Sequence, residues 1–349
     1  MGVYHKGEDV ARVVFFSLFA LQHRGQESAG ICISDGTRIR NRTSMGLVTH
    51  AFTEDDLLDM PGHLGIGHTR YSTTGSSRIA NAQPIVARGN NVELALGHNG
   101  NIINAEELRQ ELEEHGCEFL SSSDSEIIAQ TISTAPSDNW PGRIAHAMRK
   151  LRGAYSLTVV AEDAVIGVRD PLGVRPLCVG RMNDGWIIAS ESCALDHVGA
   201  IYVRDVDPGE AVIIDEAGFR TLYRSNRDSQ RASCIFENIY FARPDSLLNG
   251  HRVYNDRLRM GAELAKEYPV DADMVIAVPD SATAAAVGYS QESGIPFGEG
   301  LIKNRYVGRT FIEPDQRFRD LGVRRKLNPL PEQIEGKRLV VVDDSIVRG

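Results

Sequence analysis

The pattern of apolar residues changes part-way along the chain, and this change constrains the fold more than any other feature. Before about residue 225, short apolar runs are divided by Gly, Asn and Asp, which indicates short strands in stacked, largely antiparallel sheets. After it, apolar runs alternate with helical stretches, which is typical of a parallel sheet covered on both faces. The polar run 224–231 has no apolar period and suits a linker. We therefore predict two domains, residues 1–228 and residues 229–349, of α+β and α/β class.

Hydrophobic periodicity and turn residues place the individual elements. The first predicted helix, 9–22, has apolar residues at helical spacing and is expected to be buried. The other predicted helices are 105–115, 124–133, 140–151, 254–268 and 282–291. The predicted strands are 29–34, 64–68, 92–98, 157–161, 164–169, 177–180, 186–190, 274–278 and 338–342.

Charge and cysteine usage argue against several classes of protein. Lys and Arg total 38 against 47 Asp and Glu, so the net charge of -9 provides no basic field for nucleic acid or anionic lipid. The apolar stretch 13–21 is far shorter than the ~20 residues that span a bilayer, and it lacks the features of a signal peptide. The five cysteines are scattered and include no CxxC pair, which favours a reducing cytoplasm over a disulfide framework.

The strongest local motif is a pair of acids that follows the last predicted strand. Asp343 and Asp344 come directly after the apolar run 338–342, at the carboxyl edge of the predicted parallel sheet, where open α/β folds bind ligands. Adjacent carboxylates suit a sugar diol or hydrated Mg²⁺, and the N–H groups of the next loop suit a phosphate. The alternative is a solvated turn after a core strand. A second strand end of this kind at 278–282 favours a ligand site.

A basic segment, 301–311, stands out in this acidic chain. Around a central glycine it contains Lys303, Arg305, Tyr306, Arg309 and Thr310. These side chains suit a mobile loop that closes on a polyphosphate, although a basic loop by itself is more often a solvated surface. Three segments suited to anions around one sheet edge favour the ligand-binding interpretation.

Three segments together resemble one family. The acidic run 343–349, the basic segment 303–311 and the polar segment 22–27 look like those of glutamine phosphoribosylpyrophosphate amidotransferases. The resemblance covers essentially the whole chain. It implies an N-terminal-nucleophile hydrolase layered sandwich followed by a type I phosphoribosyltransferase parallel-sheet domain. A hexosamine-forming glutaminase shares the front motifs but would carry a sugar isomerase, and segment 303–311 counts against it.

The resemblance implies the first committed step of de novo purine biosynthesis. Glutamine is hydrolysed in the first domain, and its ammonia passes to the second, where it displaces pyrophosphate from phosphoribosylpyrophosphate to form phosphoribosylamine. The family further implies a cytoplasmic homotetramer that purine nucleotides inhibit as end products. No nucleic acid or membrane partner is expected.

The resemblance also implies the residues of the glutamine pocket. Arg70 would hold the α-carboxylate of glutamine as a bidentate pair, and Arg24 would support the catalytic end of the pocket. Asn99 and Gly100 match an oxyanion hole made of one side-chain amide and one backbone N–H. Asp124 matches the carboxylate that receives the substrate ammonium. Without the resemblance, Asn99 and Gly100 would be interpreted as a turn and Asp124 as a helix cap.

The phosphoribosylpyrophosphate site is implied in the same way. Asp343 and Asp344 match the pair that binds this substrate with Mg²⁺, and Ser281 matches a hydroxyl near the metal. The substrate-binding residues implied are Lys303, Arg305, Tyr306, Arg309, Thr310, Asp343, Asp344 and Ser345. Cys234 matches the first ligand of the 4Fe–4S cluster found in one branch of the family, the alternative being a buried free thiol.

The chain departs from the family pattern at both ends. The family nucleophile is a cysteine at the mature N-terminus, whereas this chain begins Met1-Gly2-Val3 and its first cysteine is Cys32. We expect a few residues, including the nucleophile, to be missing, so the chain as written should not hydrolyse glutamine. Gly349 falls inside the expected phosphate loop, and one matching cysteine cannot provide the roughly four thiolates of a cluster.

The expected explanation is an incomplete record of a complete enzyme, with residues 229–349 poorly stable in isolation. The alternative is a phosphoribosylpyrophosphate-binding regulatory protein that has lost glutaminase activity.

Overall fold

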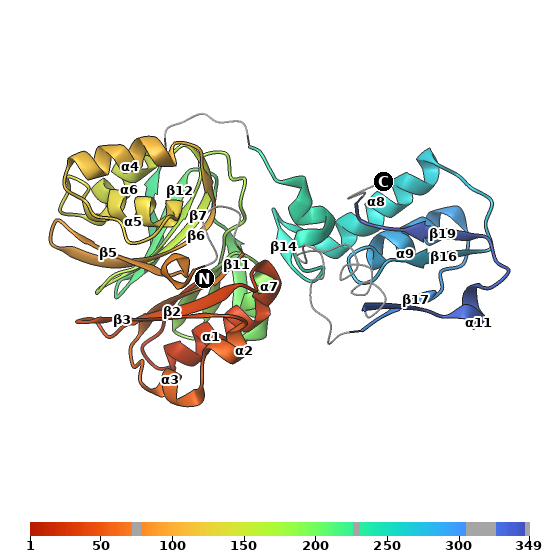
Figure 1. Cartoon of the computed structure of the whole chain (residues 1–349), viewed down its shortest axis with the longest axis horizontal. Coiled ribbons are helices and arrows are strands. Elements are labelled where there is room, and N and C mark those ends of the chain that lie inside the picture. The colour runs from red at the N-terminus through yellow and green to blue at the C-terminus, as the bar shows by residue number, and fades with distance from the viewer. Residues whose placement is uncertain (72–77, 226–230, 305–325, 346–349) are drawn as a thin grey trace. The chain divides into compact units, whose positions relative to one another are not determined.

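A computed structural model of the chain describes residues 1–71, 78–225, 231–304 and 326–345, and two compact units are present (Figure 1). The first unit comprises residues 1–234 and 247–250, and the second unit comprises residues 235–246 and 251–349.

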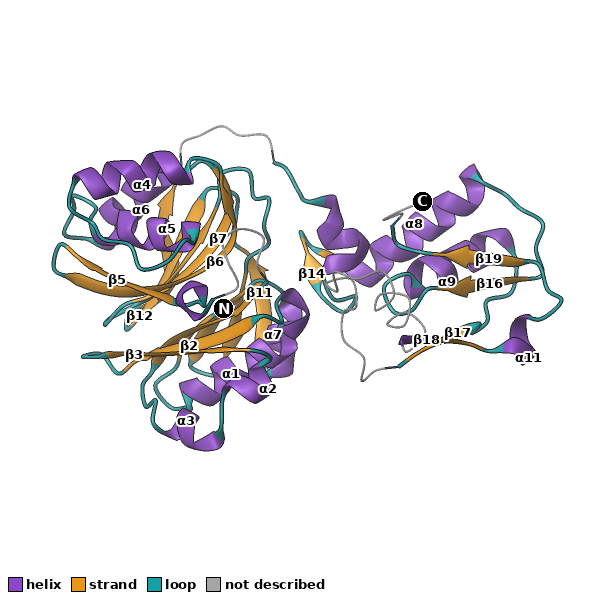
Figure 2. Cartoon of the chain, in the orientation of Figure 1, coloured by secondary structure: helices purple, strands orange, loops and turns teal. Residues whose placement is uncertain are grey.

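Two antiparallel sheets form the centre of the first unit (Figure 2). The strands of one sheet are β1 (Gly2–Tyr4), β2 (Ser28–Ser34), β3 (Ile39–Met45), β4 (Leu64–Arg70), β9 (Cys178–Met182), β10 (Gly185–Ala189) and β11 (Ile201–Asp205). Those of the other are β5 (Ile85–Gly89), β6 (Val92–Ile102), β7 (Gly153–Val160), β8 (Val165–Arg169), β12 (Glu210–Asp215) and β13 (Gly218–Arg224). Within the described residues, the strand orders are β11-β9-β10-β1-β4-β2-β3 and β13-β12-β8-β7-β6-β5.

Helices cover the outer faces of both sheets, which gives four layers. The helices beside the first sheet are α1 (Val10–Ala20), α2 (Val48–Ala51), α3 (Glu54–Leu58) and α7 (Ser192–His197). Those beside the second are α4 (Ala105–Glu114), α5 (Asp124–Ser133) and α6 (Trp140–Lys150). Between the sheets, Leu64, Ile66 and Val212 are fully buried. The predicted stack of antiparallel sheets is therefore confirmed.

The first helix differs from its prediction in length and in burial. Asp9 caps α1 by accepting from the N–H of Arg12. The helix ends at Ala20, because the chain then tightens into the 3-10 turn η1 (Gln22–Arg24). One face of α1 is buried, whereas Phe16 and Phe19 on the other are about half exposed. The predicted helix is therefore confirmed, but it is shorter than 9–22 and buried on one face.

A parallel strand pair and two closely packed helices form the described centre of the second unit. The strands are β16 (Met274–Ala277) and β19 (Leu339–Val342), and the helices are α8 (Val253–Glu267) and α9 (Thr283–Ser293). A Cβ atom on Gly261 would lie 1.8 Å from the carbonyl oxygen of Ala285, so glycine permits backbone contact between the two helices. The other elements are η2 (Ile79–Asn81) in the first unit, then η3 (Glu237–Phe241), β14 (Leu247–Leu248), β15 (His251–Arg252), β17 (Leu301–Lys303), β18 (Leu327–Pro329) and α11 (Pro331–Ile334).

The two faces of the parallel pair are covered differently. On one face Val275 and Val342 are buried in a cluster with residues of α9. On the opposite face Ile276 is buried near Gly300 and Ile334, but Val341 is 53% exposed. Among the described residues, the expected cover on both faces is thus complete on one face only, because the segments near Gly300 and Ile334 reach only one strand. None of the helices in the described ranges has the length and apolar character needed to cross a membrane.

Candidate functional site

The turn that carries Arg24 is held against the end of strand β4. The side-chain amide of Gln22 donates to the carbonyl of Gly25, and its oxygen accepts from the N–H of Val48 at 2.8 Å. A Cβ atom on Gly25 would lie 2.5 Å from the carbonyl oxygen of Thr69, so only glycine allows this backbone approach. Arg24 and Arg70, which are far apart in sequence, are therefore carried on adjacent segments.

Arg70 is buried and already has a carboxylate partner. Its Nη1 donates to the carboxylate of Glu27, and the side chains are 5% and 15% exposed. The backbone repeats this pairing, since the N–H of Glu27 donates to the carbonyl of Arg70 at 3.0 Å. A buried ion pair of this kind fixes the direction of the guanidinium. Glu27 lies in the motif 22–27, but no feature of that motif indicates this role.

Asn99 and Gly100 lie inside strand β6 and pair with Ser156 and Tyr155 of β7. The alternative interpretation as a turn was therefore wrong; the strand runs on to Ile102, beyond its predicted end. Gly100 has a φ of 152°, and a Cβ atom there would lie 2.0 Å from the carbonyl oxygen of Ala154. The Nδ2 atom of Asn99 is buried and has no hydrogen-bond partner among the described residues. An unpaired buried donor is unusual and costly, and it is typical of a site that a ligand completes.

Asp124 is the first residue of helix α5, but Ser123 caps that helix by accepting from the N–H of Ser125. The interpretation of Asp124 as the cap was therefore wrong. Its Oδ2 accepts from the N–H of Ile102 at 3.2 Å, and its Oδ1 lies 3.6 Å from Nδ1 of His98. Burial alone would raise the pKa of Asp124, but the hydrogen bond and charge of His98 and the N–H of Ile102 outweigh it and lower the pKa. Asp124 is thus a buried carboxylate held in its charged form.

His68 on β4 connects these separate observations. Burial lowers its pKa well below the ordinary histidine value, and the positive charges of the N-terminus, His98, Arg70 and Arg24 lower it further. A Cβ atom on Gly97, the residue before His98, would lie 3.5 Å from Nδ1 of His68, so β4 and β6 are in contact here. The Nε2 atom of His98 is itself buried and unpaired among the described residues. Two arginines, an amide donor and a carboxylate from four chain segments therefore gather in one region, which we call the first site (Arg24, Arg70, Asn99, Gly100 and Asp124).

Glu191 is a member of this region that the sequence did not indicate. It is fully buried, and its Oε1 receives both Nη1 of Arg24 and, at 2.7 Å, Nε2 of His23. An acid that follows the apolar strand β10 and precedes a short helix carries no motif, so only the tertiary structure identifies its partners.

The second site lies at the carboxyl edge of the parallel pair in the second unit. Ala277 and Val342 are partners in register, and the N–H of Val278 donates to the carbonyl of Val342 at 2.9 Å. The two predicted strand ends are thus neighbours, and the segments that follow them carry Asp280 and Asp343. Lys303, from the basic segment, forms an ion pair with Asp280.

The two acids after β19 are at least partly exposed, and each accepts a hydrogen bond from the residue that follows it. Asp343 is exposed, and its Oδ1 accepts from the N–H of Asp344 at 2.8 Å. Ser345 Oγ donates to Oδ1 of Asp344 at 2.7 Å. Ser281 is part-exposed and follows Asp280 directly. Of the substrate-binding residues expected in the basic segment, Arg305, Tyr306, Arg309 and Thr310 lie outside the described residues.

The donor chemistry of the two expected metal sites differs. Carboxylates and hydroxyls of Asp343, Asp344 and Ser281 are hard oxygen ligands, which fit Mg²⁺. Cys234 is half-buried, and no group of three or more His, Cys, Asp or Glu side chains suited to a metal occurs among the described residues. An iron–sulfur cluster requires about four thiolates, so the described part of the chain does not fit one.

Comparisons with known proteins bear on both units. The family model described as "Glutamine amidotransferase domain" matches residues 68–197. The chain is 52% identical to the amidophosphoribosyltransferase of Archaeoglobus fulgidus, a match over 100% of this chain and 77% of that protein. It is 50% identical to the amidophosphoribosyltransferase of Synechococcus elongatus, over 99% of this chain and 71% of that protein. The solved structure of glutamine phosphoribosylpyrophosphate amidotransferase from B. subtilis, complexed with ADP and GMP, matches with a TM-score of 0.91 and 44% identity, over 99% of this chain and 75% of that one.

Proposed function

We propose a mechanism for this chain from one premise: it belongs to the amidophosphoribosyltransferase family, whose enzymes carry out the first step of purine biosynthesis. Its first part is a glutamine amidotransferase domain of class II, the N-terminal-nucleophile type. The proposed reaction converts glutamine, phosphoribosylpyrophosphate and water to 5-phosphoribosylamine, glutamate and pyrophosphate. Ammonia released at the first site is consumed at the second, in a type I phosphoribosyltransferase domain.

At the first site, the proposed substrate is glutamine. Arg70 holds its α-carboxylate and Asp124 its α-ammonium, because a buried cation and a buried anion suit the two ends of an amino acid. Attack on the side-chain amide places negative charge on its oxygen, and Asn99 Nδ2 with the N–H of Gly100 stabilises that charge. The observation that carries this proposal is the buried, unpaired Nδ2 of Asn99. A buried donor that no described residue engages is available to an oxyanion.

The nucleophile in this family is an N-terminal cysteine, and the geometry around Met1 suits such a group. The nitrogen of Met1 is buried, donates to the carbonyl of Gly67 at 2.9 Å and is close enough to Arg24 for its charge to act on it. A residue attached to that nitrogen would begin beside the first site.

At the second site, Asp343, Asp344 and Ser281 would hold Mg²⁺, which neutralises charge on the departing pyrophosphate when it is bound. Ser345 and the N–H groups of its loop bind phosphate oxygens, and Lys303 adds a positive charge next to Asp280. Arg305, Tyr306, Arg309 and Thr310 complete this set in the proposal. Removing water from the bound substrate favours ammonia as the attacking group.

The remaining parts of the proposal rest on family membership. They are a homotetrameric assembly, a cytoplasmic location and inhibition by purine nucleotides. The relative from B. subtilis was solved with ADP and GMP, which supports the last of these. We assign no step to an iron–sulfur cluster.

The test is a comparison of two nitrogen donors on the protein isolated from its source cells. Phosphoribosylamine formation is measured with glutamine and, separately, with ammonium, and the N-terminus is sequenced. We expect product from both donors and a mature chain that begins with cysteine. Product from ammonium alone would remove the glutaminase step from the proposal. Phosphoribosylpyrophosphate binding without turnover from either donor would favour the regulatory binding protein.

A further inference from the structure

The fully buried glutamate at position 191 is unusual for its place in the fold. Glu191 is the N-cap residue of α7, but its side chain makes no capping hydrogen bond. Glutamate is not among the preferred N-cap residues, and a buried carboxylate without partners is strongly disfavoured. Helix α7 therefore does not explain why a carboxylate occupies this position. The hydrogen-bond partners of the Glu191 side chain explain it.

Those partners come from the turn η1, which is remote in sequence. Arg24 Nη1 donates to Oε1 of Glu191, and the arginine side chain is only 6% exposed. The same oxygen lies 2.7 Å from Nε2 of His23. On the other oxygen, Oε2, Cys193 Sγ donates over 3.7 Å. One buried carboxylate thus holds two consecutive basic side chains of η1.

The backbone of η1 is fixed independently of this contact. Gly25 lies against the backbone of Thr69 and Arg70 with no room for a Cβ atom, and Gln22 ties the turn to Val48. The position of the Arg24 backbone is therefore set by neighbours, and Glu191 holds the end of its long side chain through Nη1. An arginine side chain has many rotamers, and a buried carboxylate selects one of them.

We propose that Glu191 is a positioning residue for glutamine hydrolysis, whose carboxylate orients the guanidinium of Arg24 at the first site. The inference rests on the function proposed above for Arg24. Glu191 does not touch the substrate; it acts through the arginine, and its loss lets the guanidinium leave the geometry that glutamine hydrolysis requires.

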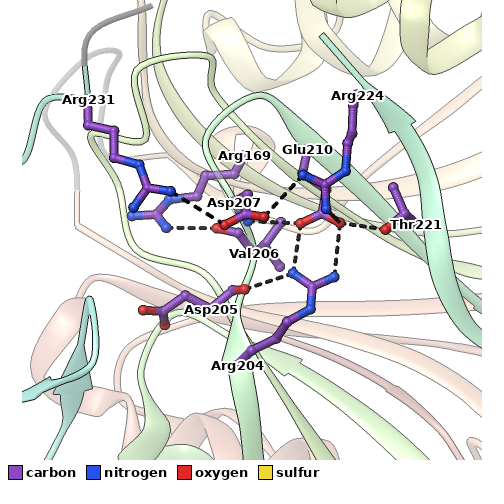
Figure 3. Close-up of polar contacts among 9 residues, drawn as sticks. All are labelled: Arg169, Arg204, Asp205, Val206, Asp207, Glu210, Thr221, Arg224 and Arg231. Carbon is purple, nitrogen blue, oxygen red and sulfur yellow. Dashed lines mark hydrogen bonds and ion pairs between the residues drawn. The ribbon is translucent and has the colours of Figure 1, made fainter.

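The first unit contains a matched control for this role. Glu210 is likewise fully buried and bound by arginine: Arg204 donates to its two oxygens at 2.7 and 2.9 Å, and Thr221 Oγ1 donates at 2.6 Å (Figure 3). Arg224 also donates to it, at 3.2 Å. None of these partners belongs to the first site. Replacing either glutamate disturbs a buried ion pair, but only Glu191 is joined to Arg24.

The experiment compares Glu191→Gln with Glu210→Gln in the complete enzyme. Each variant is assayed with glutamine and with ammonium, and its melting temperature is recorded. We expect Glu191→Gln to lower kcat/KM for glutamine by about 10- to 100-fold, as small misplacements of a catalytic-site group do. Its ammonium-dependent rate stays unchanged. Glu210→Gln lowers the melting temperature without changing the ratio of the two rates. Equal behaviour of the two variants in both assays would overturn the inference.

A double-variant cycle separates this inference from the function on which it rests. Arg24→Met and Arg24→Met/Glu191→Gln are assayed with glutamine, and we expect the double variant to lose no more than Arg24→Met, because each change removes the same ion pair. Losses that multiply would show that Glu191 acts by another route. A normal glutamine rate in Arg24→Met would instead refute the proposed role of Arg24, and the positioning inference with it. If Glu191→Gln does not fold, Glu191→Asp takes its place in the same cycle, because aspartate keeps the charge but shifts the position of the carboxylate.

Discussion

Substitution of Asn99 by alanine separates catalysis from stability more sharply than any other change in the first site. Nδ2 of Asn99 has no partner among the described residues, so Asn99→Ala breaks no hydrogen bond of that atom. Leaving a buried donor unpaired costs about 1–3 kcal/mol. Asn99→Ala removes this unpaired donor, and the free energy regained offsets most of the packing energy that is lost with the side chain. We expect the free energy of unfolding to change by less than about 1 kcal/mol. Loss of one oxyanion donor costs about 2.7–4 kcal/mol in the transition state, or 10²–10³ in kcat.

A second buried asparagine provides the control. Asn104 is 7% exposed; its Nδ2 donates to the carbonyl of Lys150 at 3.0 Å and its Oδ1 accepts from the N–H of Arg152 at 3.0 Å. Asn104→Ala leaves both backbone groups without their partner, which costs about 2–6 kcal/mol at about 1–3 kcal/mol each. We expect Asn104→Ala to be the less stable variant while its folded fraction keeps normal glutamine turnover.

Both variants are assayed with glutamine and with ammonium, and urea denaturation gives their stabilities. Asn99→Ala should lose glutamine-dependent product and keep the ammonium-dependent rate. Destabilisation of Asn99→Ala equal to that of Asn104→Ala would show that the amide has a partner in solution. A loss of glutamine turnover below about tenfold would refute the oxyanion assignment.

Three further outcomes are expected. Asp344→Asn should impair product formation from both glutamine and ammonium, because either donor needs bound phosphoribosylpyrophosphate; steady-state rates with each donor check this. Gly100→Ala should lower the free energy of unfolding by at least about 2 kcal/mol, because its Cβ would lie 2.0 Å from the carbonyl oxygen of Ala154, and urea denaturation beside the unhindered Gly7→Ala measures it. The pKa of Asp124 is lower in the folded state, so its stabilising effect is present above about pH 4 and is lost as the pH falls through the folded pKa. The stability difference between the native chain and Asp124→Asn should therefore narrow in acid, as unfolding curves at several pH values would show; a difference independent of pH would contradict it.

Local sequence patterns predicted the longer helices and most of the central strands, for identifiable reasons, whereas the short helices α2, α3, α7 and α11 were missed. Helix α5 begins and ends at its predicted residues, because Ser123 caps it and apolar residues recur at helical spacing. The four edge strands of the two sheets described in the first unit, β3, β5, β11 and β13, were missed. An edge strand is partly exposed and needs no continuous apolar run; β3, for example, alternates basic and polar residues. The short strand β1 and the buried strand β12 were missed as well, although the apolar run in β12 was visible.

The residues of the candidate sites also fall into two groups: those expected before the structure was known, and those that only the structure identified. Local pattern alone indicated the two acids after β19, because they follow an apolar strand directly. Arg70, Asn99 and Asp124 were implied by the family resemblance, since the local patterns of Asn99 and Asp124 by themselves are those of a turn and a helix cap. Their partners were not visible. Glu27 and His98 lie in or beside a motif that assigned them no role, and Glu191 carries no motif. A carboxylate next to a strand has the same local pattern whether it faces solvent or a buried arginine.

The sequence by itself determined which residue types are available, where the longer helices and most of the central strands lie, and that two strand ends carry acids. Those properties depend on neighbours a few residues away. Only the tertiary structure decided that Glu191 binds Arg24, 167 residues earlier in the chain, and that the amide of Asn99 has no partner among the described residues. Burial removes water as an alternative partner, so these contacts acquire their strength only when distant segments exclude solvent together.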